Sequence, residues 1–218
     1  MAYLFGDVTT VPETPAFVKS RPIAGDNRNS VLLKLDRNRH FVFIRDKKAF
    51  SEKRDRLIGR GNMIQPHRVK FMEMYFGHPL CDLGHVSDRD EGTDRRWRVA
   101  KSTKAEHLDF KFILALEGND VATNLKWVMS SNSLAVTPKP LYETWFMEGT
   151  LIPGRHYVEI RRDYADLEEK MNYYLEHPGE AERIIENAHL HVGQFRDKTL
   201  ESIVSLLVLE KYFSLAAT

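Results

Sequence analysis

Residues 117–127 combine the residue types and the position expected of a ligand-binding loop. The apolar run 110–116 before them is typical of a buried strand, and residues 125–129 after them indicate the start of a helix. Gly118 and small polar residues lie at the joint. Such a joint presents backbone N–H groups and the positive end of a helix dipole, which suits an anion such as phosphate. An ordinary structural turn explains the same pattern equally well.

A second joint of this kind lies between residues 57 and 68. Leu57 and Ile58 lead into Arg60, Gly61 and Asn62, and Pro66 then opens a helical pattern over residues 65–76. This pattern places Arg68 in the first helical turn, where a guanidinium can reach a phosphate held at that end. The alternative is an ordinary surface arginine.

Three acidic residues carry further candidate chemistry. Asp7 lies between Gly6 and a threonine-rich turn and fits a general base if a cleft covers it, or else a simple turn residue. Asp88 and Asp90 form an Asp-x-Asp pattern whose oxygens can share a hard cation, although roughly one such tripeptide is expected by chance in a chain of this composition.

Cys81 is the only cysteine, which excludes an intrachain disulfide and a cysteine-based metal site.

The composition is that of a soluble globular protein, with 218 residues, 42% hydrophobic and 29% charged. The net charge of +1 provides no global field for binding nucleic acid, so we expect no nucleic-acid partner. The N-terminus lacks the basic and apolar regions of a signal peptide, and the longest apolar run near the end, 203–209, is too short to span a bilayer. These features favour a cytoplasmic protein.

Strand-like and helix-like segments alternate along the chain, which indicates βαβ units, a mainly parallel sheet and helices at the C-terminal end. The pattern predicts strands at 31–33, 41–44, 57–58, 80–83, 110–116, 133–136 and 156–160. It predicts helices at 47–54, 65–76, 104–109, 122–130, 164–175, 179–193 and 197–213, and an aromatic turn or short helix at 142–147.

Several blocks in order along the chain resemble glycosyltransferase family 90, and within it the bacterial lipopolysaccharide (LpsA-like) glycosyltransferases. The main blocks are 117–127, 130–133, 142–146 and 156–158, and the supporting ones are 3–8, 18–23, 65–68, 78–82 and 163–170. The resemblance covers essentially the whole chain. It implies an α/β fold of GT-B-like architecture, in which a Rossmann-type parallel sheet with C-terminal helices belongs to one of two Rossmann-like halves.

The resemblance also implies a domain division. Residues 1–45 are expected to be the C-terminal part of an incomplete first half on the acceptor side, and 46–195 the domain that binds the nucleotide-sugar. Residues 196–218 are expected to form a C-terminal helix that returns toward the first half.

The activity implied is inverting, metal-independent transfer from a UDP-sugar, without a cofactor, to a lipopolysaccharide core or related surface glycan. Asp7 would deprotonate the acceptor hydroxyl. Cytoplasmic localisation, with peripheral association with the inner membrane, fits this activity. The residues expected to bind the donor are Arg60, Asn62, Arg68, Gly118, Asn119, Asp120, Val121, Ala122, Thr123, Asn124 and Lys126.

The chain departs from the family pattern at two positions. Gly59 stands where an aromatic residue usually precedes the Arg-Gly pair, and Asn124 stands where the animal enzymes carry an arginine. Lys126 is a candidate to supply the missing phosphate contact. The alternatives are a non-catalytic or truncated relative that binds nucleotide-sugar or a partner, and an unrelated α/β nucleotide-binding protein.

Overall fold

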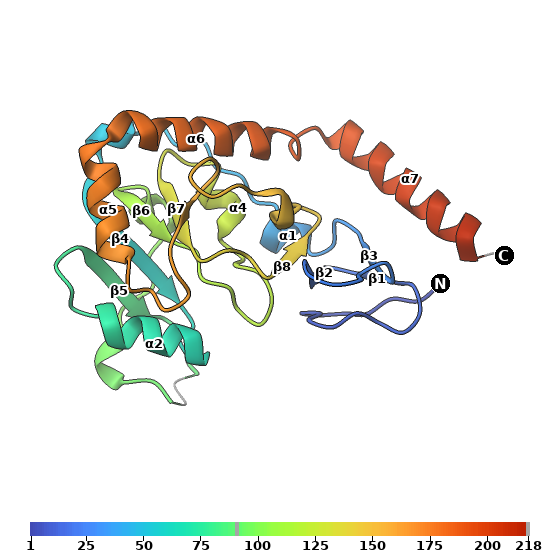
Figure 1. Cartoon of the computed structure of the whole chain (residues 1–218), viewed down its shortest axis with the longest axis horizontal. Helices are drawn as coiled ribbons and strands as arrows, with labels where there is room; N and C mark the ends of the chain where they lie inside the picture. Colours follow the sequence, from blue (N-terminus) through green and yellow to red (C-terminus); the bar gives the residue numbers. More distant parts are fainter. Residues whose placement is uncertain (90–91, 217–218) are drawn as a thin grey trace.

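The computed structural model describes residues 1–89 and 92–216, and its centre is a five-stranded parallel sheet (Figure 1). The strand order is β5-β4-β6-β7-β9, and every pairing in it is parallel. The predicted parallel sheet is therefore confirmed. Its strands are β4 (Arg54–Gly61), β5 (Cys81–His85), β6 (Phe110–Leu114), β7 (Leu134–Thr137) and β9 (Val158–Glu159).

The strand order reverses direction between β4 and β6. After β4 the chain passes through helix α2 (Pro66–Tyr75) to β5 on one side, and then returns to β6 on the other side of β4. In open α/β sheets of this order, ligands bind beyond the carboxyl ends of the strands at such a switch point. The two joints singled out in the sequence, after β4 and after β6, both lie at this place.

Side chains alternate between the two faces of the sheet and form two cores. Phe112 and Leu114 of β6 pack on one face with residues of α2 and of α5 (Leu167–Glu176), whereas Ile113 packs on the other with the short helix α4 (Leu125–Val128). The long helix α6 (Pro178–Gly193) contributes to both cores. The sheet is thus covered on both faces, which leaves the carboxyl ends of its strands as the expected place for a ligand.

The N-terminal residues form smaller pairings beside the main sheet. β1 (Ala16–Val18) pairs in parallel with β3 (Ser30–Leu32), and β2 (Ser20–Pro22) pairs antiparallel with β8 (Tyr142–Thr144). Helix α7 (Lys198–Ala216) extends beyond the sheet to these strands, so both termini lie at the same end of the molecule (Figure 1). The remaining short helices are α1 (Arg37–His40), α3 (Lys104–His107), η1 (Phe50–Glu52), η2 (Arg95–Trp97) and η3 (Glu148–Thr150).

Tyr212 fixes α7 against the N-terminal strands. Its hydroxyl donates to the carbonyl of Pro15 (3.1 Å), and its ring centroid lies 4.3 Å from that of Phe17.

Within 1–89 and 92–216, no helix combines the length and the apolar character needed to cross a membrane.

Some local predictions were wrong because side chains compete for backbone groups. The predicted helix at 47–54 is only the single turn η1, and the Asp46 carboxylate instead accepts from the backbone N–H of Lys48. The predicted strand at 41–44 is irregular, since the N–H of Ile44 donates to the Ser130 hydroxyl. The segment 142–147 was predicted as an aromatic turn or short helix; residues 142–144 instead form a strand that pairs with β2, whereas 145–146 lie in a turn.

Candidate functional site

Arg68 lies at the switch point and bridges the ends of β4 and β6. Its guanidinium donates three hydrogen bonds to backbone carbonyls: Nε to Glu117 (2.8 Å), one terminal nitrogen to Asn62 (2.7 Å) and the other to Leu116 (2.8 Å). The helix α2, begun by Pro66, holds the arginine in its first turn, as predicted from the sequence. The guanidinium therefore has a fixed orientation at the carboxyl edge of the sheet.

The positive charge of Arg68 has no carboxylate partner among residues 1–89 and 92–216. Burial lowers the pKa of its guanidinium to about 10, because removal from water disfavours the charged form. A guanidinium carries five N–H groups, so the three carbonyls leave one N–H on each terminal nitrogen. A partly buried, oriented cation with two donors to spare suits a diphosphate.

Two glycines border these terminal nitrogens. A Cβ at Gly61 would lie 3.8 Å from one of them, and a Cβ at Gly118 would lie 3.6 Å from the other. Neither glycine has a positive φ, so glycine is not needed at these positions for the backbone conformation. Its effect here is that no side chain occupies the space next to the guanidinium. A small cavity of about 40 Å³ adjoins them and is lined by Gly59, Arg60, Gly61, Met63, Arg68, Leu114, Leu116 and Asn124.

The loop after β6 is anchored at its far end by Asn124. Its side-chain amide donates to the carbonyl of Leu114 (2.8 Å), and Val121 and Ala122 are buried in the core. The helix predicted at 122–130 is the four-residue α4, so a helix dipole contributes little here. An anion at this loop would therefore depend on Arg68 and not on a long helix N-terminus.

Asp7 and the loop lie side by side, although they are far apart in the sequence. The Asn119 amide donates to Asp7 Oδ2 (3.1 Å), and the Lys19 ammonium contacts Asp7 Oδ1. Lys19 also forms an ion pair with Asp120 of the loop (2.8 Å). The half-exposed Arg39 also approaches the loop, with a terminal nitrogen 3.5 Å from the Thr123 hydroxyl. The structure thus brings the proposed base to the proposed donor loop.

Not every predicted donor residue points to this loop. Arg60 forms an ion pair with Asp82 (2.5 Å) and donates to its carbonyl, so its guanidinium is held beside β5. The Asn62 carbonyl accepts from Arg68, and its side-chain oxygen is buried without a hydrogen-bond partner among the described residues. An unpaired buried acceptor of this kind suits a ligand hydroxyl or N–H.

Lys126 does not supply the missing phosphate contact in this conformation. Its side chain is fully buried, and its ammonium is paired with Glu148 (2.7 Å) and lies over the ring of Phe146. We therefore leave it out of the proposed donor site.

Packing explains why glycine occurs at position 59, since a Cβ there would lie 2.9 Å from a methyl of Leu83 and 3.0 Å from one of Leu114. An aromatic side chain does not fit this position without repacking.

The Asp-x-Asp pattern receives little structural support as a metal site. Asp88 is almost fully exposed and pairs with Arg98 (3.3 Å), while Asp90 lies outside the described residues. Within 1–89 and 92–216, no group of three or more His, Cys, Asp or Glu side chains could hold a metal ion.

Sequence reasoning missed three groups around the loop. Lys19 is buried beside it, His40 is buried near Lys19, and the His67 ring bonds to the carbonyl of Glu117 (2.8 Å) at the start of the loop. Lys19 lies within the block 18–23 that carries part of the family resemblance, so the only available signal was a lysine next to a strand. Its carboxylate partners are distant in sequence and could not be inferred.

His40 predicts acid sensitivity of the fold. Its ring is buried, and neither nitrogen has a hydrogen-bond partner among the described residues; burial and nearby cations lower its pKa from 6.5 to about 4. As the pH falls, the unfolded chain takes up a proton at this histidine near pH 6.5, whereas the folded chain does so only near pH 4. The free energy of unfolding therefore decreases as the pH is lowered from 6.5 to 4. In urea unfolding at about pH 7 and pH 5, His40→Leu should show a smaller pH dependence than wild type. The exposed control His177→Ala should retain the wild-type dependence.

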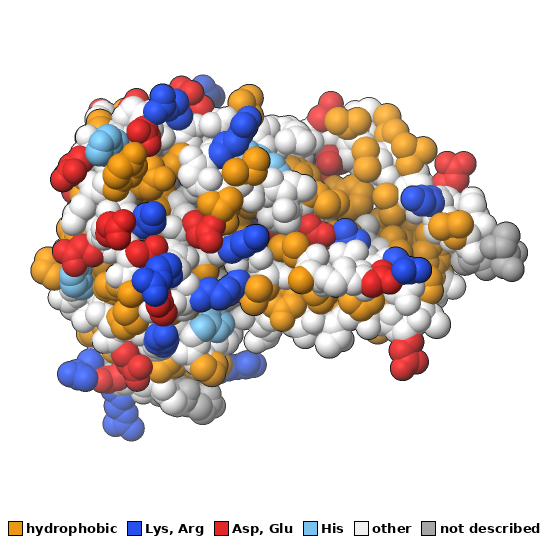
Figure 2. All heavy atoms as spheres, viewed as in Figure 1, with side chains coloured by type: hydrophobic (Ala, Val, Ile, Leu, Met, Phe, Trp, Pro, Cys, Tyr) orange, Lys and Arg blue, Asp and Glu red, His pale blue; other side chains and the backbone are white. Residues whose placement is uncertain are grey.

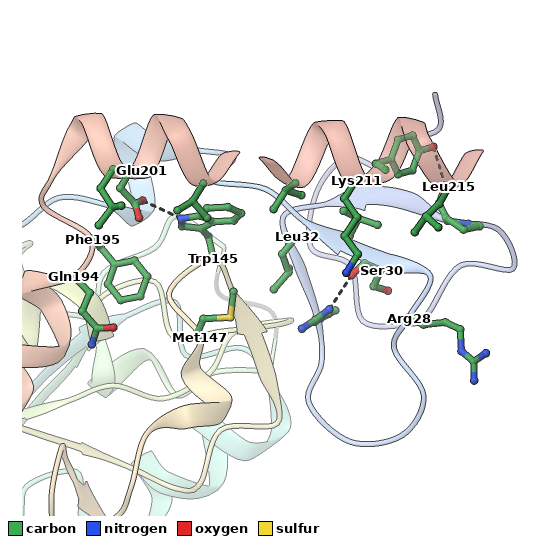
Figure 3. Close-up of a pocket in the computed structure, with 17 residues that line it drawn as sticks. Arg28, Ser30, Leu32, Trp145, Met147, Gln194, Phe195, Glu201, Lys211 and Leu215 are labelled. Carbon is green, nitrogen blue, oxygen red and sulfur yellow. Dashed lines mark hydrogen bonds between the residues drawn. The ribbon is translucent and has the colours of Figure 1, made fainter. Parts of the chain in front are cut away.

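A second, larger hollow lies under α7, away from the loop. It has a volume of about 710 Å³, and hydrophobic side chains gather along it (Figure 2). Trp145 lies at this hollow, and its indole N–H donates to Glu201 (2.9 Å; Figure 3). Glu201 also pairs with Lys34. No residue that lines it belongs to the loop or to the ends of β4 and β6.

The five-stranded parallel sheet, covered by helices on both faces and with an oriented arginine at its switch point, defines an α/β protein of the doubly wound class. The model of glycosyl transferase family 90 matches residues 31–212, and the chain belongs to this family.

Curated relatives carry glucosyltransferase names. The chain is 51% identical over 211 residues to the O-glucosyltransferase LpsA of Dichelobacter nodosus, which covers 97% of this chain and 66% of that protein. It is 27% identical over 147 residues (65% of this chain, 28% of the relative) to the human protein O-glucosyltransferase 3, and 33% identical over 169 residues (75% and 33%) to the rat protein of the same name. The chain thus spans just under two thirds of the bacterial relative and about a third of the animal ones.

Proposed function

We propose that this protein is a glycosyltransferase that binds a UDP-sugar beyond the ends of β4 and β6. The observation that carries the proposal is the Arg68 guanidinium, which is oriented by three carbonyls, has no carboxylate partner among the described residues and keeps two N–H groups available. A diphosphate would neutralise this charge and accept both hydrogen bonds. Gly61, Asn62 and the loop 118–124 complete the proposed donor site.

The proposed transfer is a single displacement with inversion. The acceptor hydroxyl oxygen attacks the anomeric carbon while its proton passes to the Asp7 carboxylate. The bond between the anomeric carbon and the diphosphate oxygen breaks, and UDP leaves with the electron pair. Arg68 stabilises the charge that develops on the departing oxygen, so this route needs no metal.

The sugar and the acceptor are proposed from the relatives. Glucose is the sugar in the names of the bacterial and animal proteins, and a lipopolysaccharide core or related surface glycan is the acceptor class that fits the bacterial one. We further propose the GT-B-like arrangement for the family architecture, with 46–195 as the donor domain, 1–45 on the acceptor side and 196–218 as the returning helix. A cytoplasmic protein at the inner membrane fits this role.

Arg68→Ala should weaken UDP binding by about tenfold or more in isothermal titration calorimetry, because the substitution removes the charge and both free N–H donors. Arg68→Lys should fall between this variant and wild type, since it keeps the charge and loses the planar geometry. The control is Arg183→Ala on α6, where the side chain is 71% exposed and far from the strand ends in sequence. Near-wild-type affinity of Arg68→Ala would remove Arg68 from the site.

A further inference from the structure

Lys19 joins the proposed base to the proposed donor loop by charge. It lies between β1 and β2, and only 5% of it is exposed. Its ammonium contacts the Asp7 carboxylate on one side and the Asp120 carboxylate on the other. The contact with Asp7 is also a hydrogen bond, whereas that with Asp120 (2.8 Å) is an ion pair without hydrogen-bond geometry.

We propose that Lys19 is a positioning residue, which holds Asp7 in place for proton transfer and ties it to the donor loop through Asp120. This inference rests on the proposed function, because it assigns Asp7 the role of base. It adds a residue that does not touch the substrates and acts through the two carboxylates.

The exposures of the two carboxylates decide which of them faces the reactants. Asp120 has a side chain that is only 3% exposed, so it serves as an internal anchor for Lys19. The side chain of Asp7 is 24% exposed and remains accessible from solvent. One ammonium between two carboxylates leaves a net negative charge, and Asp7 is the carboxylate placed to receive a proton.

Both oxygens of Asp7 are held from different directions. Lys19 contacts Oδ1, and the amide of Asn119 donates to Oδ2. Two donors on separate elements fix the plane of the carboxylate, which a proton acceptor requires for a defined approach to a hydroxyl. Asn119 contacts Asp7 directly, and its neighbour Asp120 contacts Asp7 through Lys19. A shift of the loop therefore moves both of the groups that hold Asp7.

The charges around Asp7 also set its protonation. Burial raises its pKa, but hydrogen bonds from Lys19 and Asn119 and the positive charges of Lys19 and Arg39 together outweigh burial, and the result is a pKa below its usual range. Asp120 adds a negative charge beside Lys19, and His40 nearby is neutral above a pH of about 4. Asp7 is therefore ionised at neutral pH, in the form that accepts a proton.

The test measures the titration of Asp7 by ¹³C NMR of labelled carboxyl groups, together with UDP binding by calorimetry. Lys19→Met should raise the midpoint of Asp7 by about one pH unit or more, because its cationic partner is lost. The same variant should weaken UDP binding severalfold, because Asp120 no longer holds the loop. Lys19→Arg should restore both values. An unchanged Asp7 midpoint in a folded Lys19→Met protein would overturn the proposal.

Asp120→Asn decides the case if Lys19→Met does not fold. This variant keeps the contact between Lys19 and Asp7, so the midpoint of Asp7 should stay low while UDP binding weakens. Wild-type UDP affinity in Asp120→Asn would overturn the link to the loop. If the wild-type protein fails to bind UDP, the proposed function fails, whereas the midpoint of Asp7 in the Lys19 variants still decides whether Lys19 positions it.

Discussion

Lys126→Met is expected to lower the free energy of unfolding by about 3–5 kcal/mol, because it leaves the buried Glu148 carboxylate without its cation. The Lys126 side chain is fully buried, and that of Glu148 is 1% exposed. Glu148 also accepts from the backbone N–H (2.7 Å) and the hydroxyl of Thr144. These bonds hold the carboxylate in the core, so it cannot turn out to water when the lysine is lost.

A double-mutant cycle tests this interpretation. Lys126→Met with Glu148→Leu should be more stable than Lys126→Met alone, because the double variant contains no unpaired buried charge; the recovery is partial, since Thr144 loses its acceptor. Lys70→Met, at an exposed position on α2, is the matched control and should change stability by less than about 0.5 kcal/mol. Urea unfolding at neutral pH gives the free energy of unfolding for each variant. If Lys126→Met proves as mild as Lys70→Met, the ammonium is not a structural cation and its exclusion from the donor site has to be reconsidered.

The parallel sheet was predictable because its signal is local. Residues 110–116 and 133–136 are predominantly apolar, as expected for strands buried on both faces, and both contain strands of the central sheet. The irregular segments were not predictable for the opposite reason. Whether the N–H of Ile44 joins a strand or bonds to the Ser130 hydroxyl depends on a residue 86 positions away.

The difference between local and long-range signals also explains which site residues were predictable. The position of Arg68 was predictable because Pro66 fixes the start of α2 and hence places the arginine in the first turn. Lys126, in contrast, looked available for phosphate because its sequence does not show that Glu148 and Phe146 enclose it. Lys19 was overlooked because a lysine acquires a role only when its partners are known. Charged residues were thus the least predictable part of the site, since burial and pairing decide what they do.

Asp7→Asn is expected to reduce the turnover number for sugar transfer by about 10²- to 10⁴-fold, the usual contribution of a general base. The amide has nearly the shape of the carboxylate but accepts no proton at neutral pH. The substituted side chain cannot act as base, whereas Arg68 and the glycines beside it are unchanged. UDP affinity should therefore stay within about threefold of wild type, and the loss should appear in turnover.

The split between binding and turnover is what identifies the base. Asp26→Asn is the matched control, since Asp26 is an exposed aspartate that, like Asp7, is paired with a basic side chain, here Arg28. It should leave both quantities unchanged. Turnover at the wild-type level in Asp7→Asn, with UDP still bound, would refute the assignment and direct attention to another proton acceptor. A joint loss of binding and turnover would instead show that Asp7 acts through the loop, because Asn119 and Lys19 connect it to the donor site.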